Sequence, residues 1–456
     1  KARAVREAAE DAALAAAARP GAAAAAAAAL EAREKLEKPG PALAAACASA
    51  LLDPTDQALT DILRRAFGHE AFRPGQLEVI RRVVRGGSTL ALLPTGAGKS
   101  LTYQLPALLF PGLTLVVSPL LALMADQLRG LPPALPGAAL RSDQSQAHLF
   151  AVLDEMRAGK LKVLFVSPER LLNERFLNDL RFVPGGVSLA VVDEAHCISH
   201  WGHDWRQDYT KLGFLKKQFE TVPVMALTAT ATQKVQDDIK ESLHLQKCEC
   251  FRNSVDRPNL QYEVSLKPPG ADDSHQAIFD AIEERFSGQP GIVYCFSKKE
   301  AEALATFLQR KGLRAKFYHA DMELYGASAG RSGRMEVYAE WSDGRVQVIV
   351  ATIAFGMGIN KLDVRFVMHH SMSKSVSAYY QEAGRAGRDG KPATCLLFYK
   401  PADAIRQSTM AVGNQLHGAV QGVYDLVSLA HSLSPSLSCA RARARSLSRV
   451  PFWHFL

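Results

Sequence analysis

The chain has 456 residues, enough for two or three domains, and its 48% apolar share allows sizeable cores. No apolar run reaches membrane-spanning length, and we find no secretory signal at Lys1, so we expect no membrane partner. The seven scattered cysteines lack zinc-ligand spacing and are typical of reduced thiols in an intracellular protein, and the net charge of +8 allows for an acidic partner such as nucleic acid.

The first 52 residues are rich in alanine and are interrupted by prolines such as Pro39 and Pro41. They carry too few large apolar side chains for a core, so we expect a low-complexity linker or a frayed helix. Arginines in this stretch would suit an organellar targeting segment, but the acidic residues among them argue against one. We expect order to begin near Asp53, with Asp56 capping a helix that runs toward Phe67.

The segment from Phe67 to Gln76 carries three polar side chains that could recognise a base. The amide of Gln76 could bond N6 and N7 of adenine, Arg73 could bond or stack on the same ring, and His69 could stack. A helix-loop-helix with surface polar residues is the competing interpretation. The position of the segment, some twenty residues before a glycine-rich loop, favours a nucleotide site.

That glycine-rich loop follows a strand-like run and precedes a helix-like run. Gly96 and Gly98 let backbone N–H groups turn inward toward a phosphate, and the helix N-terminus adds positive potential. Lys99 would reach the β- and γ-phosphates, and the Ser100 hydroxyl would hold Mg²⁺. Leu93 stands where the common pattern has glycine, which favours a helicase-type ATPase over a nucleotide kinase. The residues expected to bind nucleotide here are Thr95, Gly96, Ala97, Gly98, Lys99 and Ser100.

Apolar runs alternate with helix-like runs along the rest of the chain, which predicts parallel sheets. We expect helices at Leu101–Leu109 and Lys298–Lys311, and strands at Thr89–Leu93, Leu113–Val117, Val163–Val166, Ser188–Val192, Val224–Leu227, Gly291–Cys295, Ala315–Tyr318, Val346–Ala351 and Val367–His369.

The acidic pair Asp193–Glu194 follows one of these strands. Asp193 would hold a metal ion through its coordination shell, Glu194 would polarise an attacking water, and His196 would couple the site to the segment beyond it. A lone acidic pair could instead cap a turn, but its spacing from Lys99 is typical of an ATPase. Hydroxyls from Thr228 onward could bond back to Asp193 and His196.

Residues that could contact nucleic acid lie at neighbouring strand ends. Ser118 and Ser167 each follow a strand and precede proline, which suits contacts to the phosphates of a single strand. The segment after His196 combines aromatic and basic side chains that could stack on unpaired bases, although a structural aromatic cluster is the alternative. Its predicted DNA contacts are His200, Trp201, His203, Trp205 and Arg206.

A proline- and glycine-rich stretch at Lys267–Ser274 predicts a domain boundary, followed by a second α/β domain. Near its end, Arg385 and Arg388 stand on a glycine-rich segment and could reach across an interface to a γ-phosphate. A basic, solvated helix start is the alternative. Gly384 and Gly387 disfavour a simple helix and favour close approach to another segment.

Together these segments resemble the RecQ-type helicases of superfamily two, from about Thr55 to Val427. The resemblance implies an α/β fold of two tandem RecA-like domains, with ATP and Mg²⁺ in the cleft between them and Gln381, Arg385 and Arg388 completing the catalytic set. It implies movement 3′ to 5′ on single-stranded or 3′-tailed duplex DNA during repair, recombination or replication. The location implied is nuclear in a eukaryote and cytoplasmic otherwise. The expected divisions are 1–52, 53–266, 267–400 and 401–456.

The chain departs from the family at three places. The aromatic loop has His200, Trp205 and Gln207 where the family usually has Gln, Phe and Pro. Residues 324–330 look like a surface insertion. Beyond residue 427 the family places four cysteines and a winged helix, whereas this chain offers only Cys439, so we expect no zinc site, a disordered and aberrant or truncated tail, and impaired unwinding. An RNA helicase and a non-unwinding, DNA-binding isoform are the alternative functions.

Overall fold

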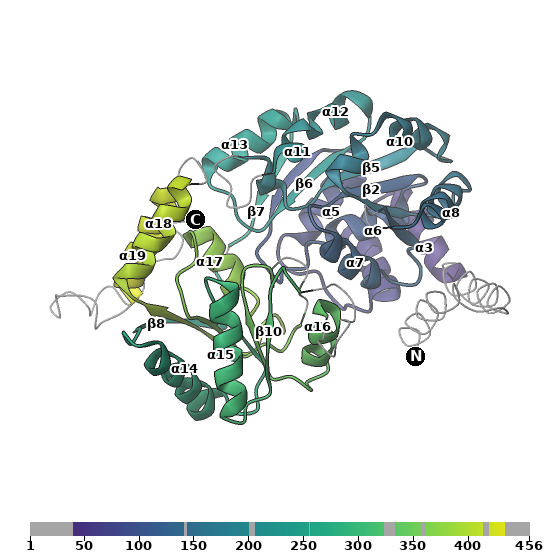
Figure 1. Ribbon diagram of the computed structural model, residues 1–456. Coiled ribbons are helices and arrows are strands. Elements are labelled where there is room, and N and C mark those ends of the chain that lie inside the picture. Colours follow the sequence, from purple (N-terminus) through teal and green to yellow (C-terminus); the bar gives the residue numbers. More distant parts are fainter. Residues whose placement is uncertain are drawn as a thin grey trace.

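The computed structural model describes residues 40–140, 144–199, 206–254, 256–322, 333–356, 359, 361–413 and 419–433. Within them the chain forms two α/β domains that lie side by side (Figure 1). Each domain has one sheet, and all paired strands run parallel. No helix in the described ranges is long and apolar enough to cross a bilayer.

The first sheet has the order β3-β4-β2-β5-β6-β1-β7. Its strands are β1 Thr89–Leu92, β2 Leu113–Val117, β3 Gly137–Leu140, β4 Val163–Val166, β5 Val187–Val192, β6 Val224–Thr228 and β7 Glu249–Arg252. The second sheet has the order β10-β11-β9-β12-β13-β8. Its strands are β8 Leu260–Leu266, β9 Gly291–Tyr294, β10 Ala315–Tyr318, β11 Val348–Ala351, β12 Phe366–His369 and β13 Ala393–Tyr399.

Helices connect and cover the strands. In the first domain they are α3 Pro41–Leu52, α4 Asp56–Ile62, the π-helix η1 Leu63–Phe67, α5 Gln76–Val84, α6 Leu101–Leu109, α7 Leu121–Arg129, α8 Gln146–Arg157, α9 Pro168–Leu171, α10 Glu174–Asp179, η2 Leu180–Phe182, η3 Ala195–Ile198, α11 Gln207–Thr210, η4 Lys211–Gly213, α12 Phe214–Gln218 and α13 Gln233–Ser242. The second domain has α14 Ala271–Phe286, α15 Lys298–Arg310, α16 Arg334–Ser342, α17 Val376–Ala383, α18 Pro401–Gly413 and α19 Ala419–Leu433.

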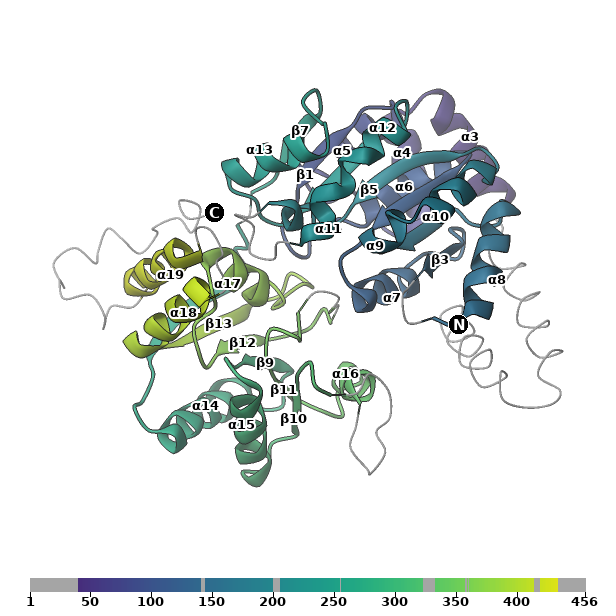
Figure 2. The same ribbon diagram turned by 45° about the horizontal axis from the view of Figure 1, so that its top comes forward.

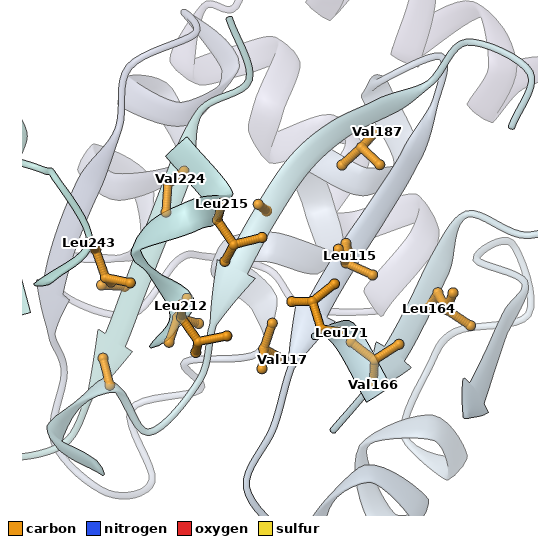
Figure 3. Packing of buried hydrophobic residues seen from close by; sticks show 14 of the residues in the cluster. Leu115, Val117, Leu164, Val166, Leu171, Val187, Leu212, Leu215, Val224 and Leu243 are labelled. Atoms are coloured by element: carbon orange, nitrogen blue, oxygen red, sulfur yellow. The ribbon is translucent and has the colours of Figure 1, made fainter. Parts of the chain in front are cut away.

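The strands are continuous apolar runs because both faces of each sheet are covered. In β2, Leu115 and Val117 join the core on one face and Val116 joins the core on the other, as the alternation of a strand requires. Figure 3 shows Leu115 and Val117 beside Leu164 and Val166 of β4. Parallel packing sends the loops after β1, β2, β5 and β6 to one edge of the sheet, where open α/β folds bind ligands.

The expected strands all form, with ends that differ by at most two residues. The start of the ordered chain differs more. Helix α3 begins at Pro41, before the expected start at Asp53, and it buries Leu43 and Ala50 against a cluster that includes Leu105 of α6. The capping prediction at Asp56 is also wrong. Thr55 is the N-cap of α4, because its hydroxyl accepts a hydrogen bond from Ala58 N at 3.2 Å.

The domain boundary lies earlier than the proline-rich stretch at Lys267–Ser274 predicts. Strand β8, which ends at Leu266, pairs with β13 at the edge of the second sheet, so it belongs to the second domain. The link between the sheets is therefore residues 253–259, and the proline-rich stretch merely connects β8 to α14. The pairing of β8 with a strand far along the chain decides this domain boundary, and the local composition of the sequence gives no sign of that pairing.

Helices α18 and α19 pack together on the second domain beside α17 (Figure 2). Val423, Leu426 and Leu429 of α19 are buried in the core that also holds Tyr379 of α17. The division expected at residue 400 therefore separates helices that share one core with the preceding sheet. Residues 324–330 and the tail with Cys439 lie outside the described ranges.

Candidate active site and nucleic-acid interface

A cleft of about 820 Å³, called here the first cleft, lies between the two domains. The expected site residues that line it are His69, Arg73, Gln76, Thr95, Gly96, Gly98, Lys99, Ser100, Asp193 and Glu194 from the first domain and Gln381, Arg385 and Arg388 from the second. Residues from His69 to Arg388, which lie far apart in sequence, thus meet around one space.

The glycine-rich loop joins β1 to α6 at this cleft. Gly96 and Gly98 have φ of +80° and +76°, a left-handed conformation that suits glycine. These conformations support the prediction that the loop turns its backbone inward. Ser100 then leads directly into α6.

Gln76 braces this loop. Its side chain is 2% exposed, its Nε2 donates to the carbonyls of Ala97 at 2.8 Å and Gly98 at 3.0 Å, and its Oε1 accepts from Arg73 N at 2.8 Å. The Arg73 guanidinium in turn donates to the Gly96 carbonyl. Both Nε2 hydrogens are used on the loop, so the expected adenine contact would require the amide to leave these carbonyls. That contact remains a prediction.

The acidic pair follows β5 at the same edge. Asp193 is 3% exposed, and its Oδ2 accepts from Gln127 Nε2 of α7 at 2.7 Å. Burial, and to a lesser extent the negative charge of Glu194, raise the pKa of Asp193 above its usual value. Glu194 has φ of +50°, which is uncommon for a residue with a side chain and frequent at functional sites. Tyr209 OH holds the Asp193 carbonyl at 3.1 Å.

His196 lies behind the cleft, buried between the acidic pair and β6. Its Nδ1 is 3.0 Å from Thr228 Oγ1 and 3.3 Å from Glu194 Oε2. Because the Thr228 hydroxyl donates to the Thr230 carbonyl, it can accept from His196, which assigns the proton to Nδ1. Burial lowers the pKa of His196 to about 3, so the ring is neutral at pH 7. The expected bond between the threonine segment and His196 is present.

The arginine segment lies opposite the loop. Helix α17 ends at Ala383, and the chain then turns through Gly384 and Gly387. Burial, and to a lesser extent the positive charges of Arg385 and Arg257, lower the pKa of Arg388 to about 10. The Arg388 guanidinium therefore stays charged at pH 7. A Cβ on Gly384 would lie 2.2 Å from Thr95 Oγ1, so the two domains touch closely at this glycine. A solvated helix start is therefore wrong for this segment.

A second cleft, of about 1010 Å³, also runs between the domains. Its basic lining residues are Arg129 and Arg206 from the first domain and Lys298, Lys299, Arg334, Lys374 and Arg385 from the second. Ile359, Gln381 and Arg385 line both clefts. These shared residues give a physical connection between the two spaces.

Of the residues expected to contact nucleic acid, Ser118 differs from prediction, whereas the contacts expected of Ser167 and Arg206 stay predictions. Ser118 is 0% exposed, so its hydroxyl faces the interior of the sheet edge and not a strand of nucleic acid. Ser167 caps α9 by accepting from Arg170 N at 3.3 Å, and it lines a small surface pocket of about 380 Å³. Arg206 bonds the Pro119 carbonyl at 3.0 Å. The other expected contacts, His200, Trp201, His203 and Trp205, lie outside the described residues.

Sequence reasoning missed the residues of the interdomain link. Arg257 donates to carbonyls of both domains, and the Asn253 side-chain amide donates to the Pro74 carbonyl. The sequence also assigns no role to Gln127, which donates to Asp193. Their partners are mostly backbone carbonyls, which leave no residue-type signal in a sequence.

Comparisons with known proteins agree with this geometry. Residues 73–239 match the DEAD/DEAH box helicase family and residues 273–390 match the helicase conserved C-terminal domain. The chain is 46% identical to "ATP-dependent DNA helicase Q-like 2" of Arabidopsis thaliana over 379 residues, 82% of this chain and 52% of that protein. It is 44% identical to "ATP-dependent DNA helicase Q1" of Rattus norvegicus over 387 residues, 84% of this chain and 60% of that protein.

This chain belongs to the RecQ-type helicases. A bacterial relative, "ATP-dependent DNA helicase RecQ" of Pasteurella multocida, is 44% identical over 357 residues, 77% of this chain and 53% of that protein. The chain thus spans between about half and three fifths of the length of these relatives.

Two solved structures share the fold. The Mycobacterium smegmatis helicase Lhr bound to ssDNA and AMP-PNP has a TM-score of 0.60 at 22% identity, covering 84% of this chain and 54% of that chain. Mss116p bound to ssRNA and AMP-PNP has a TM-score of 0.62 at 17% identity, covering 86% and 83%. The expected pair of RecA-like domains is confirmed.

Proposed function

We propose that the chain is an ATP-dependent DNA helicase or translocase that hydrolyses ATP in the first cleft while single-stranded DNA occupies the second. One observation carries the proposal: the first cleft gathers a phosphate-type loop, an acidic pair and two arginines from separate domains. A site shared by two domains would open and close if the domains moved, which suits a motor. The names of its relatives support ATP as the nucleotide and DNA as the partner.

The loop and the first acid would hold the phosphates and Mg²⁺. The fit is good, because Gly96 and Gly98 line the cleft in a left-handed conformation and Asp193 is a buried carboxylate fixed by Gln127. Ser100 and Asp193 would hold the ion, and Lys99 would contact the phosphates. Bound Mg²⁺ would neutralise charge on the phosphate oxygens.

Glu194 would orient the attacking water, since its carboxylate lines the cleft beside the loop. Neutral His196 would donate its Nδ1 hydrogen to the Thr228 hydroxyl while Glu194 Oε2 lies 3.3 Å from the same nitrogen, so β6 could respond to the state of the acid. Arg385 and Arg388 would stabilise negative charge that develops on the transferred phosphate. These groups come from the second domain, so turnover would require closure.

DNA would occupy the second cleft, where lysines and arginines from both domains could contact phosphates. Gln381 and Arg385 line both clefts, so domain closure on the nucleotide would also change the DNA site. The expected aromatic loop would supply stacking next to Arg206. We propose movement 3′ to 5′ on single strands or 3′-tailed duplexes, acting on nuclear DNA in a eukaryote.

The test is a steady-state ATPase assay with no nucleic acid, with single-stranded DNA and with single-stranded RNA. We expect DNA to stimulate turnover more than RNA. Glu194→Gln should keep binding of a fluorescent ATP analogue and lose at least a hundredfold in kcat, whereas Lys99→Ala should lose both. Glu241→Gln, at an exposed position of α13, is the matched control. Unchanged turnover in Glu194→Gln, or stimulation by RNA alone, would contradict the proposal.

A further inference from the structure

Arg257 lies in the link between the two sheets and touches both sides of the first cleft. Its Nη1 donates to the Thr95 carbonyl at 3.1 Å in the glycine-rich loop and to the Gly384 carbonyl at 3.3 Å in the second domain. Its Nη2 donates to the carbonyls of Ala386 at 3.0 Å and Gly387 at 2.7 Å. Its Nε donates to Asn259 Oδ1 at 3.3 Å.

The acceptors are uncharged, and four of the five are backbone carbonyls. A guanidinium suits this arrangement, because it is planar and offers five N–H donors in a fixed fork. A lysine ammonium is a single point with three donors and cannot span the same carbonyls. The contacts therefore depend on the shape of arginine as well as on its charge.

Arg257 joins the interdomain link to the glycine-rich loop and to the arginine segment, and the loop and the arginine segment carry the groups proposed to act on the phosphates. A Cβ on Gly96 would lie 3.5 Å from both Arg257 Nη1 and Arg388 Cγ, so the link, the loop and the arginine segment meet here. Thr95 Oγ1 also donates to the Gly384 carbonyl at 3.3 Å. Arg257 itself does not line the first cleft among the residues described there.

The same link reaches the segment before the loop. The Asn253 amide donates to the Pro74 carbonyl, and a Cβ on Gly75 would lie 2.3 Å from Asn253 Oδ1. At the other end Asn259 Nδ2 donates to the carbonyls of Gly387 and Lys391, each at 2.9 Å. Asn253, Arg257 and Asn259 of the link thus each bond to a segment beside the cleft.

We propose that Arg257 is a positioning residue that holds the arginine segment, residues 384–388, in a fixed relation to the glycine-rich loop. It would act through Arg385 and Arg388 without touching ATP, because it holds the carbonyls of their chain neighbours Gly384, Ala386 and Gly387. Without it the two segments would be joined chiefly through Thr95, and the arginines would spend less time aligned with the phosphates. Misalignment of this kind lowers the rate of chemistry more than the affinity for nucleotide.

The first test rests on the proposed ATPase function and uses the full chain. Arg257→Ala should lower kcat at least tenfold while the Kd of a fluorescent ADP analogue changes less than threefold. Arg257→Lys should recover little of the rate, because the fork is lost although the charge stays. Arg314→Ala is the matched control, since Arg314 also donates to carbonyls, those of Gly344 and Arg345, but only within the second domain.

A double variant separates positioning from general damage. If Arg257 acts through Arg388, then Arg257→Ala combined with Arg388→Ala should cost about as much in kcat as Arg388→Ala alone. Losses that multiply would overturn the proposal, as would full activity in Arg257→Lys.

Hydrogen exchange tests the same idea without turnover. In Arg257→Ala, peptides covering residues 92–98 and 383–389 should both exchange faster, whereas Arg314→Ala should change neither. Unchanged exchange in either peptide would overturn the inference. If the unmodified chain hydrolyses no ATP but exchange responds as expected, the proposed function fails and the positioning role stands.

Discussion

The buried amide of Gln76 offers a sharp test of how the glycine-rich loop is held. Gln76→Glu keeps the size of the side chain and the acceptor for Arg73 N, but it removes both donors to the carbonyls of Ala97 and Gly98. Each net hydrogen bond is worth about 1 kcal/mol, so the change should cost about 2 kcal/mol. A carboxylate oxygen facing carbonyl oxygens adds to this cost.

The lost hydrogen-bond energy should lower both the free energy of unfolding and the affinity for nucleotide. Nucleotide affinity is affected because the loop binds phosphate only when its backbone is in place. A share of about 1.4 kcal/mol in binding corresponds to a tenfold higher KM. The assay is steady-state turnover of ATP and of GTP, with urea unfolding on the same preparations. Since the amide braces the loop, KM should rise equally for both nucleotides.

Gln236→Glu is the matched control. Gln236 is 4% exposed, and its Nε2 donates to the Ala231 carbonyl at 2.7 Å, away from the cleft. It should lose stability and leave KM unchanged. If Gln76→Glu narrows the gap between ATP and GTP instead of raising both KM values, the amide reads the adenine base and the bracing interpretation is refuted.

The remaining predictions concern the interface and the second domain. Gly384→Ala should lower kcat, because the added methyl meets Thr95 Oγ1 and pushes the arginine segment from the loop, and an unchanged kcat would contradict this contact. Trp341→Ala should destabilise the second domain by about 3–5 kcal/mol in urea unfolding, since the 0% exposed ring leaves a large cavity. Burial lowers the pKa of His370 to about 3, below its unfolded value, so the folded state resists protonation and stability should fall as pH drops below about 6.5. His370 faces Lys267, Ser274, His275, Glu300, Lys400 and Arg406. His370→Gln should flatten the pH dependence by up to about 1.4 kcal/mol per pH unit, and an unchanged slope would assign the effect to another group.

The sequence by itself determined the local features of this protein. Doubly covered parallel strands are continuous apolar runs, so β2 and β4 could be placed to the residue. Gly96 and Gly98 mark a loop that needs left-handed backbone, and Asp193 and Glu194 follow a buried strand. Each of these signals depends on residues close together in the chain, so pattern and spacing are enough to predict them.

Only the tertiary structure decided which distant segments meet. It assigned β8 to the second sheet, buried Ser118 at the sheet edge and placed Arg257 between the loop and the arginine segment. The acceptors of Arg257 are mainly backbone carbonyls, and every residue carries one. A contact of this kind has no residue-type pattern, so it exists only once the chain has folded and the two domains have come together.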